Sequence, residues 1–247
     1  MRSSVTLWVE LKRAILVALL VLGVAGPGGT GRAFATSPPQ PVAGKPYGKS
    51  YREWAAEWWQ WSLQIPASVN PATDLTGRYC SVGQRGEVWF LAGLFGGGVV
   101  ERTCSVPKGV ALLFPLVNGV WVSTKGDPAY GIYPGDPRLR QFAPSLRREV
   151  ACVRPARRLQ LWIDGAAVAG LDRFGENSLF FAAELPPDHV FSAAIGPDPV
   201  LVTPNVDSGY YVLFRPLPSG RHTLHWIAQD GCGNQQEVTY HLRVGGS

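Results

Sequence analysis

Frequent glycine and proline residues set the main limit on how this 247-residue chain can fold. The sequence holds 29 Gly and 21 Pro, together with nine Trp and a hydrophobic fraction of 46%. Glycine and proline favour turns and end helices, so most elements between them must be short. The apolar and aromatic residues are numerous enough to build a core. We therefore expect a mostly β fold in which short strands are joined by tight turns.

Apolar segments bounded by these turn residues predict a two-sheet, jelly-roll-like β-sandwich of about 8–10 strands. Asp164-Gly165 lies between two of the segments and matches a type I′ hairpin turn. Residues 209–216 are apolar at successive positions, which is typical of a central strand covered on both faces. The expected strands span residues 87–92, 98–104, 110–117, 159–163, 166–171, 177–183, 190–194, 209–216, 221–228 and 237–244.

Two helices are predicted beside these strands. Ser50 and Glu53 form the pattern of a capping box, and a stripe of tryptophans follows up to Pro66, which predicts an N-terminal helix over residues 50–65. We expect its tryptophan face to pack on a sheet, since each buried indole removes about 150–250 Å² from water. A sugar-stacking or membrane-surface site is the alternative. A short Arg-rich helix is expected over residues 145–153, either as a solvated helix face or as a polyanion site.

The first 35 residues have the order of an export signal. A basic start is followed by an apolar run over residues 14–25 and by Ala33-Phe34-Ala35, a small-x-small cleavage site. The apolar run is shorter than the roughly 20 residues that cross a bilayer. We expect residues 1–35 to be a signal peptide, with an uncleaved anchor as the alternative. Residues 36–247 would then form a single secreted or periplasmic domain without an integral membrane segment.

The charge balance argues against a nucleic-acid partner. The chain carries 23 Lys and Arg against 18 Asp and Glu. Residues 1–35 hold four of the basic residues and one of the acidic ones. After signal removal the excess of positive charge is therefore small, and it gives no electrostatic reason to expect a polyanionic partner such as nucleic acid.

The four cysteines all follow the expected cleavage site. An even number of cysteines in an exported chain suggests disulfide bonds. Cys80 and Cys104 flank one apolar block, so we favour a bond between them. Cys152–Cys232 follows by elimination, and buried free thiols remain the alternative for that pair. The spacing matches no zinc motif, so neither a metal nor a cofactor is expected.

Catalytic candidates are few. If Ala228 pairs with Val238 in the last hairpin, His225 and His241 face each other on its outer surface, where two imidazoles could share a metal. A solvated pair of polar residues is the favoured interpretation, because no third ligand lies nearby. No Gly-x-Ser-x-Gly nucleophile motif is present. Available carboxylates, none paired by sequence, are Glu53, Glu57, Glu87, Asp172, Glu176 and Asp207.

Seven sequence blocks stand out along the chain, at residues 47–61, 70–71, 84–93, 102–107, 209–213, 216–224 and 238–242. Taken in order, these blocks resemble a group of uncharacterised secreted bacterial proteins. The resemblance implies export and a Cys80–Cys104 bond, and it implies no activity. The segment 216–223, Pro-Leu-x-x-Gly-x-His-Thr, is also similar to the closing hairpin of immunoglobulin-like or jelly-roll adhesion domains.

Two functions are compatible with these patterns. The favoured one is a non-catalytic exported protein that binds a surface ligand or glycan, or assembles, at the cell surface or in the periplasm. The alternative is a secreted hydrolase of envelope polymers or glycans that uses a carboxylate pair brought together by folding. The expected discriminating feature is a concave, tryptophan-lined cleft with two carboxylates, which would favour the hydrolase.

Overall fold

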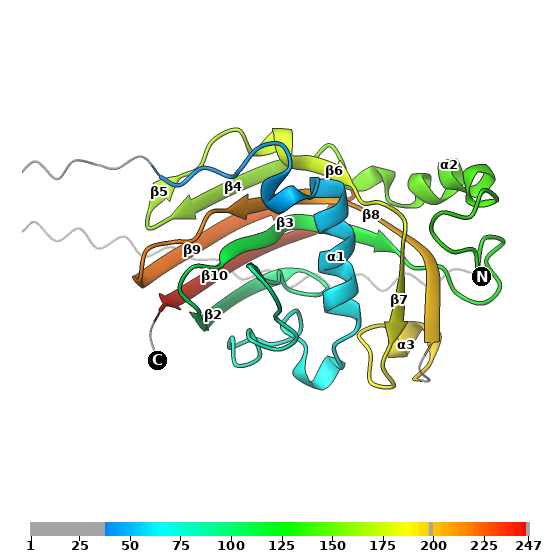
Figure 1. Cartoon of the computed structure of the whole chain (residues 1–247), viewed down its shortest axis with the longest axis horizontal. Coiled ribbons are helices and arrows are strands. Elements are labelled where there is room, and N and C mark those ends of the chain that lie inside the picture. The colour runs from blue at the N-terminus through cyan, green and yellow to red at the C-terminus, as the bar shows by residue number, and fades with distance from the viewer. Residues whose placement is uncertain (1–37, 198–199, 246–247) are drawn as a thin grey trace, which may run out of the picture. The chain divides into compact units, whose positions relative to one another are not determined.

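The computed structural model describes residues 38–197 and 200–245, and the described chain is mostly β (Figure 1). The expected signal peptide, residues 1–35, lies outside the described residues. The strands form two five-stranded sheets. Sheet 1 contains β1 (Val88–Phe90), β3 (Ala111–Trp121), β8 (Val200–Phe214), β6 (Gly175–Asn177) and β7 (Phe181–Leu185). Sheet 2 contains β2 (Gly98–Val106), β10 (Gln235–Val244), β9 (Gly220–Gln229), β4 (Arg158–Ile163) and β5 (Ala166–Ala167).

The two sheets pack face to face through aromatic side chains, which confirms the β-sandwich expectation. Phe114 of β3 stacks on Trp226 of β9 with ring centroids 4.8 Å apart, and Trp226 stacks in turn on Tyr240 of β10 at 5.9 Å. Trp226 is fully buried. Most strand pairs are antiparallel, while β1–β3 and β2–β10 are parallel. The Asp164-Gly165 turn between β4 and β5 has positive φ at both residues, as the type I′ signal predicted.

The tryptophan-rich helix α1 (Tyr51–Leu63) crosses sheet 1 on the side away from sheet 2 (Figure 1). It begins at the predicted capping box, in which Ser50 and Glu53 exchange hydrogen bonds. Its four indoles are at most 8% exposed, and Trp58 lies against Tyr211 of β8 with ring centroids 6.4 Å apart. The expectation that the tryptophan face belongs to the core is therefore confirmed.

Three sequence expectations for the middle of the chain are wrong in detail. The Arg-rich helix α2 (Leu139–Glu149) begins well before residue 145, because Asp136 accepts hydrogen bonds at its start and Leu139 is buried beneath it. Residues 190–194 do not form a strand, and α3 (Ser192–Ile195) lies there instead. The expected strand over 177–183 is divided between β6 and β7, which pair with different parts of β8. Short 3-10 turns occur at Pro46–Gly48, Ala67–Val69, Ala151–Val153 and Leu171–Phe174.

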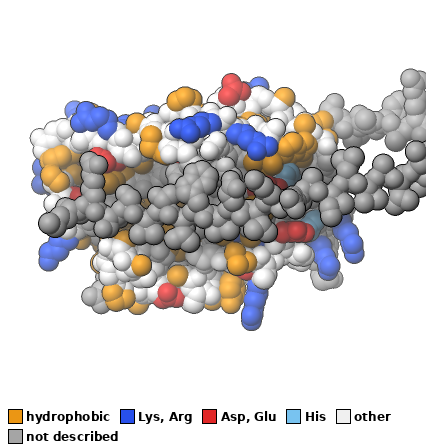
Figure 2. Space-filling view, turned by 180° about the vertical axis from the view of Figure 1, so that it is seen from behind, with side chains coloured by type: hydrophobic (Ala, Val, Ile, Leu, Met, Phe, Trp, Pro, Cys, Tyr) orange, Lys and Arg blue, Asp and Glu red, His pale blue; other side chains and the backbone are white. Residues whose placement is uncertain are grey.

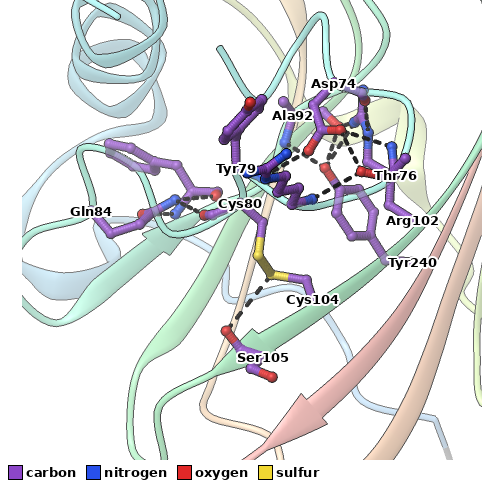
Figure 3. Close-up of a disulfide and its surroundings, with 12 residues drawn as sticks. Asp74, Thr76, Tyr79, Cys80, Gln84, Ala92, Arg102, Cys104, Ser105 and Tyr240 are labelled. Carbon is purple, nitrogen blue, oxygen red and sulfur yellow. Dashed lines mark hydrogen bonds between the residues drawn. A yellow bond between two sulfur atoms is a disulfide. The ribbon is translucent and has the colours of Figure 1, made fainter. Parts of the chain in front are cut away.

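Two disulfide bonds are present, Cys80–Cys104 and Cys152–Cys232. The first joins the long loop after α1 to β2, as predicted (Figure 3). The second joins the turn after α2 to the β9–β10 loop, so these cysteines are not free thiols. Within the described residues, no helix is both long and apolar enough to cross a membrane.

Candidate functional site

A cavity of about 240 Å³ lies between the C-terminal half of α1, β3 and the loop over residues 93–97. We call it the α1 cavity. Helix α1 contributes Trp58, Trp59 and Ser62 to its wall, and β3 contributes Asn118 and Val120. Residues 93–97 and 234–236 complete the wall, which is therefore built from segments far apart in the sequence.

Aromatic rings dominate the wall and the entrance of the α1 cavity. Trp58 and Trp59 line it with adjoining edge-to-face rings, 5.1 Å between centroids. At the opening, Phe95 and Phe191 meet edge to face at 5.4 Å. Phe95 is 39% exposed, so an apolar ring is accessible at the entrance of the cavity.

The outer loop of the cavity is held in place by a buried arginine. Arg102 of β2 is 1% exposed, and its Nη1 donates to the carbonyls of Ala92 at 2.6 Å and Gly93 at 3.1 Å. Figure 3 shows this guanidinium beside Tyr240 and Asp74, close to the Cys80–Cys104 bond. Its hydrogen bonds satisfy backbone carbonyls that the core would otherwise leave unpaired. The loop is thus fixed from within the sandwich.

A second anchor fixes the loop from the opposite side. The amide of Leu94 donates to Gln236 Oε1 at 2.9 Å, and Gln236 Nε2 donates to the carbonyl of Leu116 at 2.6 Å. A side chain at Gly93 would place its Cβ 2.3 Å from Gln236 Oε1, so glycine is needed for this approach. The cavity is consequently preformed, since both of its sides are tied to the sheets.

A chain of hydrogen bonds leads from the cavity wall into the core. Asn118 Nδ2 donates to the Tyr211 hydroxyl at 2.9 Å, and that hydroxyl donates to Asp207 Oδ2 at 2.7 Å. Asn118 lies opposite Gly209 in the β3–β8 pairing. A Cβ at Gly209 would come within 2.6 Å of the Asn118 Cβ, so the glycine leaves the space that Asn118 fills.

Asp207 is the most unusual titratable group of the described chain. It is 0% exposed, and burial raises the pKa of its carboxyl to about 7, against opposing effects of Tyr211, Trp59 and the backbone. Its Oδ1 and the Nε1–H of Trp59 make no hydrogen bond of normal length, although Trp59 lies close enough to the carboxyl to lower its pKa. Strongly perturbed carboxyl groups cluster at functional sites, and a buried oxygen with so few hydrogen bonds calls for an explanation.

The surface of the α1 cavity itself is neutral. Its polar side chains are hydroxyl and amide groups, chiefly Ser62, Asn118, Asn234 and Gln236. Among the described residues that line it, none carries an ionisable side chain. Asp207 stands one layer behind, separated from the cavity by the Asn118–Tyr211 pair. The arrangement can therefore pack against an apolar group and exchange hydrogen bonds, without a charge in contact with the occupant.

The prediction that His225 and His241 face each other is wrong. Ala228 pairs with Gln236 rather than Val238, because Asp230 and Asn234 close the β9–β10 loop through mutual hydrogen bonds and shift the register by two residues. His225 therefore lies opposite Thr239 and approaches its hydroxyl at 2.9 Å. His241 instead contacts Glu101 of β2 at 2.7 Å.

The other candidate ligands and carboxylates are also dispersed. No group of three or more His, Cys, Asp or Glu side chains that could hold a metal occurs among residues 38–197 and 200–245. Glu53 belongs to the capping box, where hydrogen bonds from Ser50 hold its pKa below the usual range. Glu57 is paired with Lys49.

Sequence reasoning treated Asp207 as one of several unpaired carboxylates and did not single out Tyr211 or Asn118. A signal was present in the segment Asn205–Ser208, whose polar residues interrupt the long apolar strand β8 and are buried. A charged residue within a buried strand is uncommon and points to a specific environment.

Comparison with known protein families and with curated proteins finds no match. One solved structure, "Solution Structure of Amebosin", shares 10% sequence identity with this chain and has a TM-score of 0.16. The match covers 60% of this chain and 97% of the amebosin chain. A similarity of this size carries no information on the fold or the function of this chain.

Proposed function

We propose that this protein is an exported, non-catalytic binding protein whose α1 cavity takes a small neutral ring, such as one sugar unit of a glycan. The observation that carries the proposal is the cavity wall, in which two indoles and several amides surround a space without any ionisable side chain. Binding sites combine apolar and aromatic walls with a few polar groups that orient the ligand. Trp58 and Trp59, 3% and 5% exposed, present only ring edges to the cavity, so the exposed Phe95 ring at its entrance supplies the apolar contact, and the amides suit the hydroxyls of a sugar.

The size of the cavity favours a single ring. Its volume of about 240 Å³ lies just below the roughly 300–1,000 Å³ of sites for drug-sized ligands. Burial of a charged ligand against neutral walls would leave that charge without a partner, which is strongly unfavourable. The double anchoring of the 93–97 loop by Arg102 and Gln236 reduces the entropy lost on binding.

Export is part of the proposal and rests on two observations. Residues 1–35 have the composition of a signal peptide. Two disulfide bonds join distant segments, and such bonds persist in oxidising compartments. We propose the periplasm or the cell surface as the place of action.

The hydrolase alternative receives less support. Most glycoside hydrolases flank the bond they cleave with two carboxyl groups about 5–10 Å apart. None of the described residues lining the α1 cavity is acidic, and Asp207 lies behind Trp59 and the Tyr211–Asn118 pair rather than in the wall. The geometry therefore favours binding without hydrolysis.

The test is a titration of the mature chain with single neutral sugars, in which tryptophan fluorescence reports binding. We would use glucose, galactose, mannose and N-acetylglucosamine as probes. Val120→Phe adds a ring to the cavity wall and should weaken binding of the active sugar at least tenfold. Val99→Phe makes the same change at a position that is 75% exposed and outside the cavity, and should leave binding unchanged.

Three results would contradict the proposal. The first is the absence of binding by every sugar of the panel. The second is an equal loss of affinity in Val120→Phe and Val99→Phe, which would place the site elsewhere. The third is release of reducing sugar from an added oligosaccharide, because that activity would make the protein a hydrolase.

A further inference from the structure

A second cavity lies against helix α2 and faces the other side of β8. We propose that it binds a doubly charged tetrahedral oxyanion, either a free phosphate or sulfate ion or the corresponding ester group of a larger molecule. Its volume is about 300 Å³, and we call it the arginine cavity. Three arginines line it, Arg147 and Arg148 from α2 and Arg154 from the segment that follows, together with Asn177 and Ser208.

Arg154 is fixed in position by the sheet. Its Nε donates to Ser208 Oγ and its Nη2 donates to Asn177 Oδ1, both at 3.0 Å. These bonds use two of the five N–H donors of the guanidinium and leave the others for a ligand. Gly175 makes the position possible, because a Cβ there would lie 3.1 Å from Arg154 Cδ and 2.9 Å from the Tyr210 ring.

The backbone around Arg154 is also held. The preceding turn, Ala151–Val153, carries Cys152, which is bonded to Cys232 in the β9–β10 loop. The amide of Gly231 in that loop donates to the Val153 carbonyl at 3.2 Å. A cationic group on a fixed backbone loses little entropy when an anion binds, which favours affinity at such a site.

The arginines of the arginine cavity lack a directly bonded carboxylate, although the charge of Arg154 lowers the pKa of the buried Asp207. None of its three arginines forms a salt bridge with a carboxylate of residues 38–197 or 200–245. Arg147 is partly buried against the Phe180 ring, with its guanidinium carbon 4.8 Å from the ring centroid. Burial and the nearby charge of Arg52 lower the pKa of Arg147. A bound anion would relieve both effects.

The choice of a tetrahedral dianion follows from charge and from hydrogen-bond geometry. Three guanidinium groups offer bidentate hydrogen bonds that match phosphate and sulfate oxygens. A polyanion such as nucleic acid needs a continuous basic surface. On the part of the molecule that Figure 2 draws in colour, Lys and Arg side chains are interspersed with Asp and Glu instead of forming one basic patch. A further arginine, Arg138, lies just before α2 and outside the cavity, and it is already paired with Asp136.

This site is independent of the α1 cavity. Ser208 and Asp207 are consecutive residues of β8, so their side chains point to opposite faces of sheet 1. Asp207 belongs to the hydrogen-bond chain behind the α1 cavity, while Ser208 holds Arg154. Failure of sugar binding would therefore leave the oxyanion site untouched, and the reverse also holds.

The experiment is isothermal titration calorimetry of the mature chain with sodium phosphate and sodium sulfate, at an ionic strength kept constant with sodium chloride. We expect saturable binding with one site per chain. Arg154→Gln should weaken binding at least tenfold, and so should Arg148→Gln, which removes an exposed side chain and keeps the fold. Arg140→Gln removes an exposed arginine from the same helix, outside the cavity, and should change affinity less than twofold.

Two further titrations identify the source of the anion. Tighter binding of glucose 6-phosphate than of inorganic phosphate supports an ester group on a larger ligand, whereas the reverse order supports the free ion. The proposal is overturned if phosphate and sulfate give no more heat than chloride. It is also overturned if Arg140→Gln weakens binding as much as Arg154→Gln and Arg148→Gln.

Discussion

Replacement of Asp207 by asparagine should remove most of a pH dependence of stability that the wild-type protein shows below neutrality. The Asp207 carboxyl is 0% exposed, and its pKa is raised from 3.8 to about 7. Between these two values the folded protein keeps the proton that the unfolded chain releases. The free energy of unfolding of the wild type must therefore fall as the pH rises through this window.

The size of the effect follows from the shift of the pKa. Each pKa unit corresponds to about 1.4 kcal/mol, so a shift of about three units corresponds to roughly 4 kcal/mol between pH 4 and pH 7. The amide side chain of the Asp207→Asn variant cannot ionise, so the unfolding free energy of the variant does not fall in this way as the pH rises. The difference in unfolding free energy, variant minus wild type, should therefore rise by roughly 4 kcal/mol over the same window.

The assay is urea unfolding of both proteins at half-unit steps between about pH 4 and pH 8. Tyr211→Phe provides a second measurement, because the Tyr211 hydroxyl donates to Asp207 and lowers its pKa. Without that bond the decline in stability should extend to higher pH. A variant-minus-wild-type difference that stays constant with pH, within about 1 kcal/mol, would refute the assignment of a buried, proton-binding Asp207.

Three other predictions concern the core, a disulfide and export. Trp58→Ala should destabilise the protein by about 3–5 kcal/mol through loss of a buried ring, and thermal melts of the two proteins will measure the loss. Cys104→Ser should cost about 2–5 kcal/mol in chemical unfolding, and peptide mapping of the unreduced wild type should recover Cys80 linked to Cys104. Mass spectrometry of the exported protein should find Thr36 as its first residue, whereas an intact Met1 would contradict the signal peptide.

Local patterns in the sequence predicted the elements that local chemistry determines. The capping box at Ser50 and the tryptophan stripe gave the bounds of α1 within two residues, and Asp164-Gly165 predicted its hairpin turn. These features depend on neighbours along the chain, where hydrogen bonds and side-chain periodicity act directly. The start of α2 was missed because its stability comes from Leu139 and Leu146, which are buried against other parts of the fold.

The candidate sites could not be predicted because distant segments build them. Asn118 and Tyr211 are 93 residues apart in the sequence and lie on neighbouring strands. The contact between them depends on the β3–β8 register. The arginine cluster around α2 was visible in the sequence, but the side chains that orient Arg154 come from β6 and β8. The His225–His241 prediction was wrong because Asp230 and Asn234 set the hairpin register through side-chain bonds that periodicity does not report.

The most direct test of ligand binding in the α1 cavity is the set of indole N–H signals in a two-dimensional ¹H–¹⁵N NMR spectrum. Trp58 and Trp59 line the cavity, whereas Trp226 is fully buried between the sheets and serves as an internal control. Addition of the sugar that binds in the fluorescence assay should shift the Trp58 and Trp59 signals in a saturable way and leave Trp226 in place. Unchanged Trp58 and Trp59 signals at saturation, or an equal shift of Trp226, would contradict the proposed site.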